Sequence, residues 1–368
     1  MRRAADALLR RHPNLRVGFR YDELPEPVQV EYGAVPARWR AATVESTVEA
    51  ERLAAEDRAT GFDLTAPPLL RFLSIRLGED RHRLVLTAHH ILWDGWSTSI
   101  LVNELFTLYS GDEARLGAVP SYPSYLAWLA AQDRAAARKA WASALAGLDG
   151  ATTVAPRGGR TAARHQQLEH ALSAESTETI VSRAKANGIT LNTIVQGAWG
   201  VLLSHVTGRD DVVFGSSVSG RPPEIPGIEN MVGLLTNTIP VRVRVRPGES
   251  RLAMLTRLQA EQAALIPHHH LGLAEIQRQA GGELFDTAIM FVNYDFDMAR
   301  WDDALRDLRL TEFDVTDETH YPLRLAAVPG TRLRLRLGHH PVLVRPAHAR
   351  RLLDRFVSIL EAFAGENT

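Results

Sequence analysis

Residues 89–97 carry side chains that can move a proton. They read His-His-Ile-Leu-Trp-Asp-Gly-Trp-Ser and lie between a predicted buried strand over 83–88 and a helical pattern over 100–106. Because neighbouring side chains of a strand point to opposite faces, His89 and His90 cannot share a role. One faces a cleft and the other packs inside. A histidine with a nearly neutral pKa at a strand end is suited to general acid–base chemistry.

An aspartate completes this motif. Asp94 follows His90 by four residues and precedes Gly95, which permits a tight turn or the close approach of a substrate. A lone His–Asp pair is more often a hydrogen-bonded structural pair than a catalyst. Two histidines, three intervening residues, an aspartate and a glycine at a strand-to-helix junction form a far more specific pattern.

The composition is that of an ordinary globular protein. The 368 residues are enough for two lobes or domains, with 45% hydrophobic and 23% charged residues. The net charge of −1 gives no global attraction for nucleic acid or an anionic membrane. Cysteine is absent, which excludes disulfides, thiolate nucleophiles and cysteine-ligated zinc. No apolar run approaches about 20 residues and the N-terminus lacks a signal-peptide core, so we expect a cytoplasmic protein that binds neither nucleic acid nor a membrane.

Three consecutive histidines, His268 to His270, invite a metal-site interpretation. They cannot all point at one ion from a regular element, and no carboxylate cluster adjoins them in the sequence. We therefore expect no metal site.

Apolar periodicity predicts two halves of mixed strands and helices. In the first half we expect strands at 15–21, 28–30, 69–77 and 82–88, and helices at 3–11, 45–59, from the motif to Tyr109, and within 122–146. In the second half we expect strands at 211–218, 236–245, 286–293, 320–328 and 331–338, and helices at 173–186, 193–205, 250–265, 272–280 and 345–363. The pattern predicts an α/β (α+β) protein with lobes 1–148 and 167–368 joined by a linker, 149–166.

Further stretches follow one order along the chain. They are Arg11-His12-Pro13-Asn14-Leu15-Arg16-Val17-Gly18-Phe19, Tyr122–Trp128, Val218–Pro222, Met231–Arg242, His270–Leu273 and Leu284–Thr287. Together with the motif they resemble the condensation domain of nonribosomal peptide synthetases, within the chloramphenicol acetyltransferase-like superfamily, over essentially the whole chain. The resemblance implies two chloramphenicol acetyltransferase-like lobes in a V around a central tunnel, with a bridging loop near 219–235.

The resemblance also implies amide-bond formation. A carrier-bound acceptor amine would attack an aminoacyl or peptidyl thioester held on the 4′-phosphopantetheine of another carrier. The expected partners are donor and acceptor peptidyl carrier proteins and the adenylation modules of a synthetase, and no cofactor bound by the chain itself is expected. Because the acyl group arrives as a thioester, no cysteine nucleophile is needed, and positioning can contribute about 7–11 kcal/mol.

The family pattern assigns catalytic roles to two positions. His90 would face the tunnel and either take a proton from the acceptor amine or hydrogen bond to the tetrahedral intermediate. The backbone N–H of Gly95, near the helix start, is a candidate oxyanion donor.

The same pattern assigns support to other residues. His89 is expected to pack inside and orient the loop, and Asp94 to form a buried salt bridge with an arginine. Arg221 is the first candidate partner and Arg16 the second. Ser97 is expected to cap the following helix. Trp93 either lines the tunnel or packs in the interior, and Asn237 is a candidate for the tunnel wall or a helix cap.

One departure from the family pattern and three alternatives stay open at this stage. The family normally carries several tens of residues before the part that matches Met1, so we expect a truncated first lobe with an unpaired sheet edge and impaired activity. Epimerisation domains also keep the double histidine, but the run Asn237–Pro240 favours condensation. An acyltransferase using acyl-CoA or a free acceptor, and a non-catalytic carrier-protein recruitment module, are the competing hypotheses.

Overall fold

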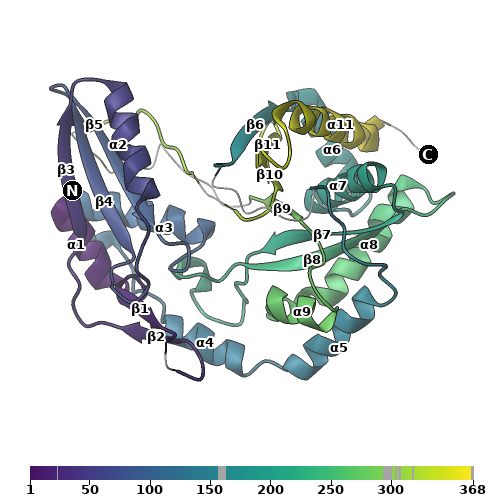
Figure 1. Cartoon of the computed structure of the whole chain (residues 1–368), viewed down its shortest axis with the longest axis horizontal. Helices are drawn as coiled ribbons and strands as arrows, with labels where there is room; N and C mark the ends of the chain where they lie inside the picture. The colour runs from purple at the N-terminus through teal and green to yellow at the C-terminus, as the bar shows by residue number, and fades with distance from the viewer. Residues whose placement is uncertain are drawn as a thin grey trace. The chain divides into compact units, whose positions relative to one another are not determined.

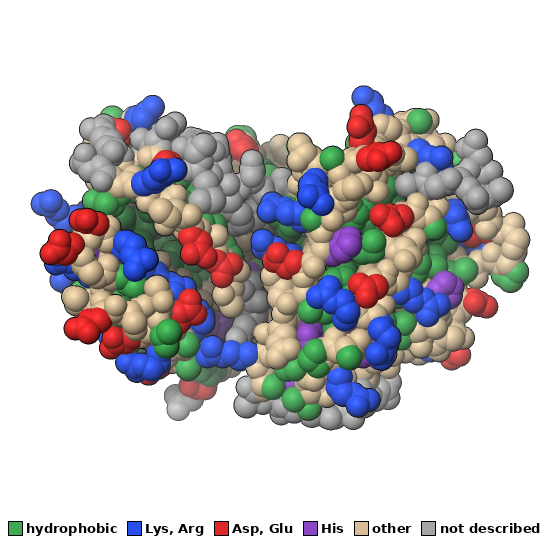
Figure 2. Space-filling view, turned by 90° about the horizontal axis from the view of Figure 1, so that it is seen from above, with side chains coloured by type: hydrophobic (Ala, Val, Ile, Leu, Met, Phe, Trp, Pro, Cys, Tyr) green, Lys and Arg blue, Asp and Glu red, His purple; other side chains and the backbone are tan. Residues whose placement is uncertain are grey.

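The chain divides into two compact units, each assembled from separate stretches of sequence. The structure is a computed structural model that describes residues 1–22, 24–155, 163–292, 301–302, 305, 308–316 and 319–365. Unit 1 comprises Met1–Ala130, Arg221–Leu235 and Tyr294–Asp314, and unit 2 comprises Ala131–Gly220, Thr236–Asn293 and Val315–Thr368. Figure 1 labels the elements of both units. On the face shown in Figure 2, acidic and basic side chains are interspersed.

A three-stranded sheet forms the centre of unit 1. β3 (Arg38–Val44) is parallel to β4 (Leu70–Leu77), which is antiparallel to β5 (Arg81–Ala88) (Figure 1). Alternate residues of β4 face two apolar clusters. One cluster includes Ala50 and Leu53 of α2 (Thr47–Ala59), and the other includes residues of α1 (Arg2–Arg11) and α3 (Gly95–Tyr109). Unit 1 also contains a hairpin of β1 (Val17–Arg20) and β2 (Val28–Glu31), and the helix α4 (Tyr122–Ala130).

Unit 2 is built on a six-stranded sheet in the order β6-β11-β10-β9-β7-β8. The strands are β6 (Gln166–Ala171), β7 (Asp211–Val218), β8 (Asn237–Arg244), β9 (Thr287–Phe291), β10 (Leu323–Val328) and β11 (Arg334–His339). The largest apolar cluster joins this sheet to α6 (Ala174–Ala186), α7 (Leu191–Thr207), α8 (Arg251–Leu265) and α11 (Pro346–Gly365). A second cluster joins it to α5 (Arg134–Leu145) and α9 (Leu273–Gln279).

Both units contain the same strand–strand–strand–helix arrangement. β3, β4 and β5 pair in parallel and then antiparallel fashion, as do β9, β10 and β11. The N–H of His89 donates to the carbonyl of Leu69, and the N–H of His340 donates to the carbonyl of Pro322, each at 2.9 Å. α3 and α11 begin equally far along the chain from these two histidines. His90 and Asp94 therefore correspond to Pro341 and Arg345 in the second copy.

The predicted elements are present close to their expected positions, and the predicted strand 211–218 coincides with β7. β3 and β6 are not predicted by the pattern. Both are edge strands whose residues are mostly polar or exposed, so neither shows the apolar alternation of a buried strand.

The boundary between the units differs from the predicted one. Unit 1 ends at Ala130 rather than at 148, because Ala137 and Trp141 of α5 pack in an apolar cluster of unit 2. The first part of the predicted linker is also fixed to unit 2, since Asp286 accepts hydrogen bonds from the N–H groups of Val154 and Ala155. Residues 156–162 of that linker lie outside the described residues.

One glycine allows α7 to approach the sheet closely. A Cβ added at Gly200 would lie 2.5 Å from Cβ of Val243 on β8, and no rotamer of Val243 moves that atom. We expect Gly200→Ala to lower the free energy of unfolding by about 1–3 kcal/mol through overpacking. Gly61→Ala is the matched control, because nothing lies within 4 Å of its added Cβ. Urea denaturation followed by circular dichroism measures both, and equal midpoints would contradict the expectation.

Candidate functional site

The two histidines of the motif lie in different environments in the loop between β5 and α3. His89 is half-buried, its ring makes an edge contact with Phe62, and its Nδ1 accepts a hydrogen bond from the N–H of Ile91 at 3.2 Å. Burial, with a smaller contribution from His90, lowers the pKa of His89. His89 is therefore a neutral imidazole that holds the loop, whereas the side chain of His90 is exposed.

Asp94 caps the helix that follows the motif. Its side chain is 1% exposed, and its Oδ1 accepts from the N–H of Ser97 at 2.9 Å. The cap expected from the sequence, Ser97, is therefore wrong. Ser97 lies inside the first turn of α3, and its Oγ lies 2.8 Å from Oδ1 of Asp94. Asp94 is the better cap because it stands immediately before Gly95, the first helical residue.

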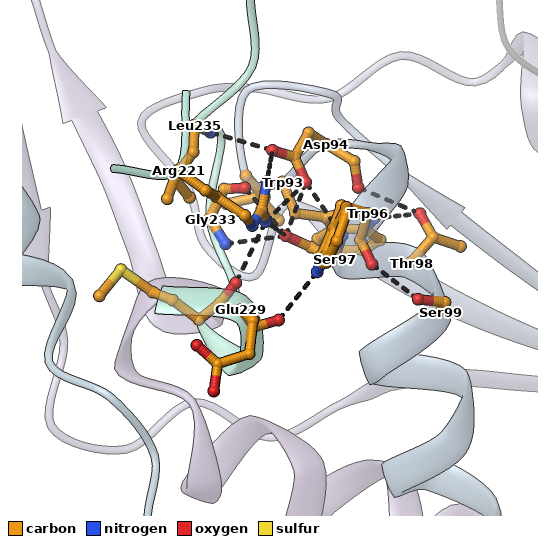
Figure 3. Close-up of polar contacts among 12 residues, drawn as sticks. Trp93, Asp94, Trp96, Ser97, Thr98, Ser99, Arg221, Glu229, Gly233 and Leu235 are labelled. Atoms are coloured by element: carbon orange, nitrogen blue, oxygen red, sulfur yellow. Dashed lines mark hydrogen bonds and ion pairs between the residues drawn. The ribbon is translucent and has the colours of Figure 1, made fainter. Parts of the chain in front are cut away.

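Arg221 forms a two-pronged ion pair with Asp94 (Figure 3). Its Nη1 donates to Oδ2 at 2.8 Å and its Nη2 to Oδ1 at 3.1 Å, and the Arg221 side chain is 4% exposed. The N–H of Leu235 also donates to Oδ2, at 3.2 Å. The guanidinium stacks over Trp96 with its central carbon 5.2 Å from the ring centroid. Arg221, the first arginine indicated by the sequence, is thus the one that the structure places beside Asp94.

The charge state of Asp94 follows from these contacts. Burial alone raises the pKa of a carboxyl group. For Asp94 that effect is outweighed by the hydrogen bonds and positive charge of Arg221 and by the hydrogen bonds from Ser97, so its pKa lies below its usual value. The carboxylate is therefore ionised at neutral pH.

The segment 221–235 is attached to the motif by backbone bonds as well. The carbonyl of Gly233 accepts from the N–H of Asp94 at 3.2 Å, and its N–H donates to Oγ of Ser97 at 3.1 Å. A Cβ at Gly233 would lie 2.3 Å from Cε2 of Tyr122, so no larger residue fits. The indole N–H of Trp96 donates to the carbonyl of Glu229 at 2.8 Å. This segment joins β7 to β8 in the sequence but belongs to unit 1.

The remaining candidates are one support residue, Arg16, and two residues proposed for the tunnel wall or a cap, Trp93 and Asn237. Arg16 donates to the carbonyls of Leu9, Arg10 and Tyr32 at 2.6, 2.8 and 3.0 Å, so it closes the end of α1 and is not the partner of Asp94. Trp93 is 8% exposed and packs in the core of unit 1, with its indole N–H on Thr98 Oγ1. Asn237 begins β8 in unit 2.

The side chain of Asn237 holds a turn. Its Nδ2 donates to the carbonyls of His269 and Leu271, each at 2.8 Å, so it does not cap a helix. Gly95 is half-buried at the first position of α3, where an N–H has no partner within the helix. The roles of Gly233 and Trp96 are not predicted by the sequence, although Gly233 lies in the stretch Met231–Arg242.

The three consecutive histidines take part in hydrogen bonds to backbone carbonyls of unit 2. The carbonyl of His268 accepts from Trp141 Nε1 at 3.0 Å, and Nδ1 of His270 lies 3.0 Å from the carbonyl of Pro267. Burial lowers the pKa of His269 to about 4. Within the described ranges, no group of three His, Cys, Asp or Glu side chains is arranged to hold a metal ion. Nor does any helix in those ranges have the length and apolar character needed to cross a membrane.

Known proteins match this chain over all or nearly all of its length. The family model described as "Condensation domain" matches residues 1–368. A component of the linear gramicidin synthase of Brevibacillus parabrevis is 32% identical over 96% of this chain and 5% of that protein. Chondramide synthase of Chondromyces crocatus is 34% identical over 92% of this chain and 9% of that protein. The chain thus spans less than a tenth of these two relatives.

Solved structures show the same fold. The first condensation domain of the CDA synthetase aligns with a TM-score of 0.77 and 21% identity, over 99% of this chain and 87% of that chain. The X-domain from teicoplanin biosynthesis aligns with a TM-score of 0.84 and 22% identity, over 99% and 86%.

Removal of the Asp94 carboxylate should cost stability in a pH-dependent way. Asp94→Ala leaves Arg221 buried without its anion, so we expect the free energy of unfolding at pH 7 to fall by about 3–5 kcal/mol. Because the folded pKa is lowered, the ionised carboxylate contributes fully above its unfolded pKa of about 3.9, and this contribution is lost as the pH falls through the folded pKa. Asp94→Asn should remove this acid-dependent loss.

Urea denaturation at pH values from about 7 down to about 2 measures these effects. Asp80→Asn is the control, since Asp80 is exposed in the hairpin turn between β4 and β5. A double-mutant cycle with Arg221→Ala isolates the pair. A cost below about 1 kcal/mol for Asp94→Ala would show that the pair does not hold this part of unit 1 together.

Proposed function

The chain belongs to the condensation domain family of nonribosomal peptide synthetases, and on this premise we propose that it forms an amide bond between two carrier-bound acyl groups. The family catalyses amide-bond formation, and the expected α/β, chloramphenicol acetyltransferase-like fold is confirmed. The observation that carries the proposal is the motif loop itself. His90 is exposed on a loop whose neighbours are fixed by the Asp94–Arg221 pair.

The proposed reaction needs no redox partner and no enzyme nucleophile. The acceptor amine attacks the carbonyl carbon of the donor thioester, and a carbon–nitrogen bond forms in a tetrahedral intermediate. The carbon–sulfur bond then breaks, and the donor's phosphopantetheine leaves as a thiolate that takes up one proton to become a thiol. The amine loses one proton in the same sequence, so the overall reaction is balanced.

We assign His90 to the attacking amine. Its imidazole would hydrogen bond to the amine and receive its proton as a general base. The N–H of Gly95, at the positive end of α3, would donate to the oxygen that becomes negatively charged. Asp94 would support both indirectly. As the cap of α3 and the partner of Arg221, it fixes the end of the loop.

The family acts on acyl groups presented on 4′-phosphopantetheine arms within synthetase modules that contain carrier and adenylation domains. We propose that this chain's substrates are two such loaded carriers and that the arm is supplied by the partner, with no cofactor resident in the chain. Positioning of two arms against one fixed imidazole would provide most of the rate enhancement, because it replaces a bimolecular encounter.

His90→Ala should abolish transfer without unfolding the chain. The protein is mixed with a donor-loaded and an acceptor-loaded carrier, and the dipeptidyl carrier is followed by intact-mass spectrometry. We expect the rate to fall by about 10²–10⁴-fold, as for loss of a general base. His82→Ala is the matched control, because His82 is another exposed histidine, on β5.

The alternatives give different results in the same assay. Carrier binding without product, unchanged by His90→Ala, would contradict the proposal and indicate a recruitment module. Product formed from acyl-CoA, but not from a loaded donor carrier, would indicate an acyltransferase with a free donor.

A further inference from the structure

The side chain of Asn14 lies against the loop that carries His90, from a part of the chain remote in sequence. Its Nδ2 donates to the carbonyl of Leu92 at 2.6 Å, in the buried interior of unit 1. Asn14 is 7% exposed and Leu92 is fully buried. We propose that Asn14 is a positioning residue that fixes the direction of His90, an inference that rests on the proposed amide-forming function.

The middle of the motif loop depends on this contact. At its start, His89 is held through its N–H on the carbonyl of Leu69 and through its Nδ1. At its end, Asp94 is held by Arg221 and Gly233. Leu92 lies between these two anchors, two residues after His90. A carbonyl that is buried without a donor is costly, so the bond from Asn14 selects one path for the backbone next to His90.

A second amide binds the side-chain oxygen of Asn14. Gln29 of β2 donates from Nε2 to Oδ1 of Asn14 at 3.1 Å. Because the Leu92 carbonyl can only accept, the Asn14 amide must direct its NH₂ group toward Leu92 and its oxygen toward Gln29. The Leu92 carbonyl thus fixes the orientation of the Asn14 amide, and Gln29, which is exposed, fits that orientation.

The backbone that carries Asn14 is itself rigidly held. Asn14 lies in a 3-10 turn, Pro13–Arg16. The side chains of His12, just before the turn, and of Arg16, at its end, both have hydrogen-bond partners. His12 Nε2 lies 2.5 Å from Oε2 of Glu104 on α3, and Arg16 closes the end of α1. α3 is the helix that Asp94 caps, so the turn, the helix and the motif loop form one closed set of contacts.

Variants that replace an amide NH₂ group with an oxygen test the positioning role of Asn14 without changing the shape of the side chain. Asn14→Asp replaces the donor with an oxygen that faces the Leu92 carbonyl. Gln29→Glu places a carboxylate against Oδ1 of Asn14 and so favours rotation of its amide, and it does so from an exposed position where folding is not at risk. Gln29→Ala is the control, because it leaves Asn14 free to keep its bond to Leu92.

Two measurements are made on each variant. For product formation from loaded carriers, we expect Asn14→Asp and Gln29→Glu to lower kcat about tenfold or more, with KM within about twofold of the parent, since misplacement of a catalytic group affects the chemical step. Hydrogen–deuterium exchange should rise in the peptide that spans 89–94 and stay at parental levels elsewhere. Gln29→Ala should match the parent in both.

The outcomes separate this inference from the proposed function. Parental exchange over 89–94 in both Asn14→Asp and Gln29→Glu, or raised exchange with a parental kcat, would overturn the positioning role. If the parent forms no dipeptidyl product, the amide-forming function fails on that result. Exchange over 89–94 then decides alone whether Asn14 fixes the loop.

Discussion

The Asp94 carboxylate is the interaction on which the rest of the site depends. A buried charge is stable only when its lone pairs are used, and here Ser97, Arg221 and Leu235 all donate to it. These donors come from α3 and from a segment more than a hundred residues later in the chain. One carboxylate therefore starts a helix, neutralises an arginine and holds segment 221–235 in unit 1. Removal of the carboxylate would leave the buried Arg221 without its opposite charge.

The repeated arrangement in unit 2 shows which residues a strand-to-helix junction of this kind can form without. His340 makes the same backbone bond as His89, and the helix that follows begins at the corresponding position. Pro341 and Arg345 stand where unit 1 has His90 and Asp94. The strand-to-helix junction thus forms without the second histidine and without the aspartate cap. A histidine at the second position is therefore not needed to form such a junction, whereas Asp94 of unit 1 also binds Arg221 and the N–H of Leu235.

Sequence patterns predict the elements that carry a clear pattern of buried apolar residues and miss those that do not. β7 contains a continuous run of buried residues and is predicted to the residue, whereas β3 and β6 are polar edge strands with no such signal. α5 is predicted as a helix, but only its contacts through Trp141 reveal that it belongs to unit 2.

In the site, too, the sequence predicts local features better than contacts between residues that are far apart in the chain. Arg221 is found from the family resemblance, since a partner 127 residues away leaves no local trace. Asp94 and Ser97 are both good caps, so the choice between them depends on the exact helix start, which periodicity does not resolve.

The two adjacent histidines show why a site of this kind needs rigidity more than reactivity. The Nδ1 of His89 is used by the Ile91 N–H, and burial keeps the ring neutral, so His89 is occupied in holding the loop. The polar groups of Asp94, Ser97 and Arg221 are likewise committed to one another. In the proposed reaction the thioester supplies the driving force, and a chain without cysteine contributes a fixed direction for one exposed imidazole. The energy of the surrounding contacts is then used for positioning, which is the contribution that a reaction between two tethered substrates requires.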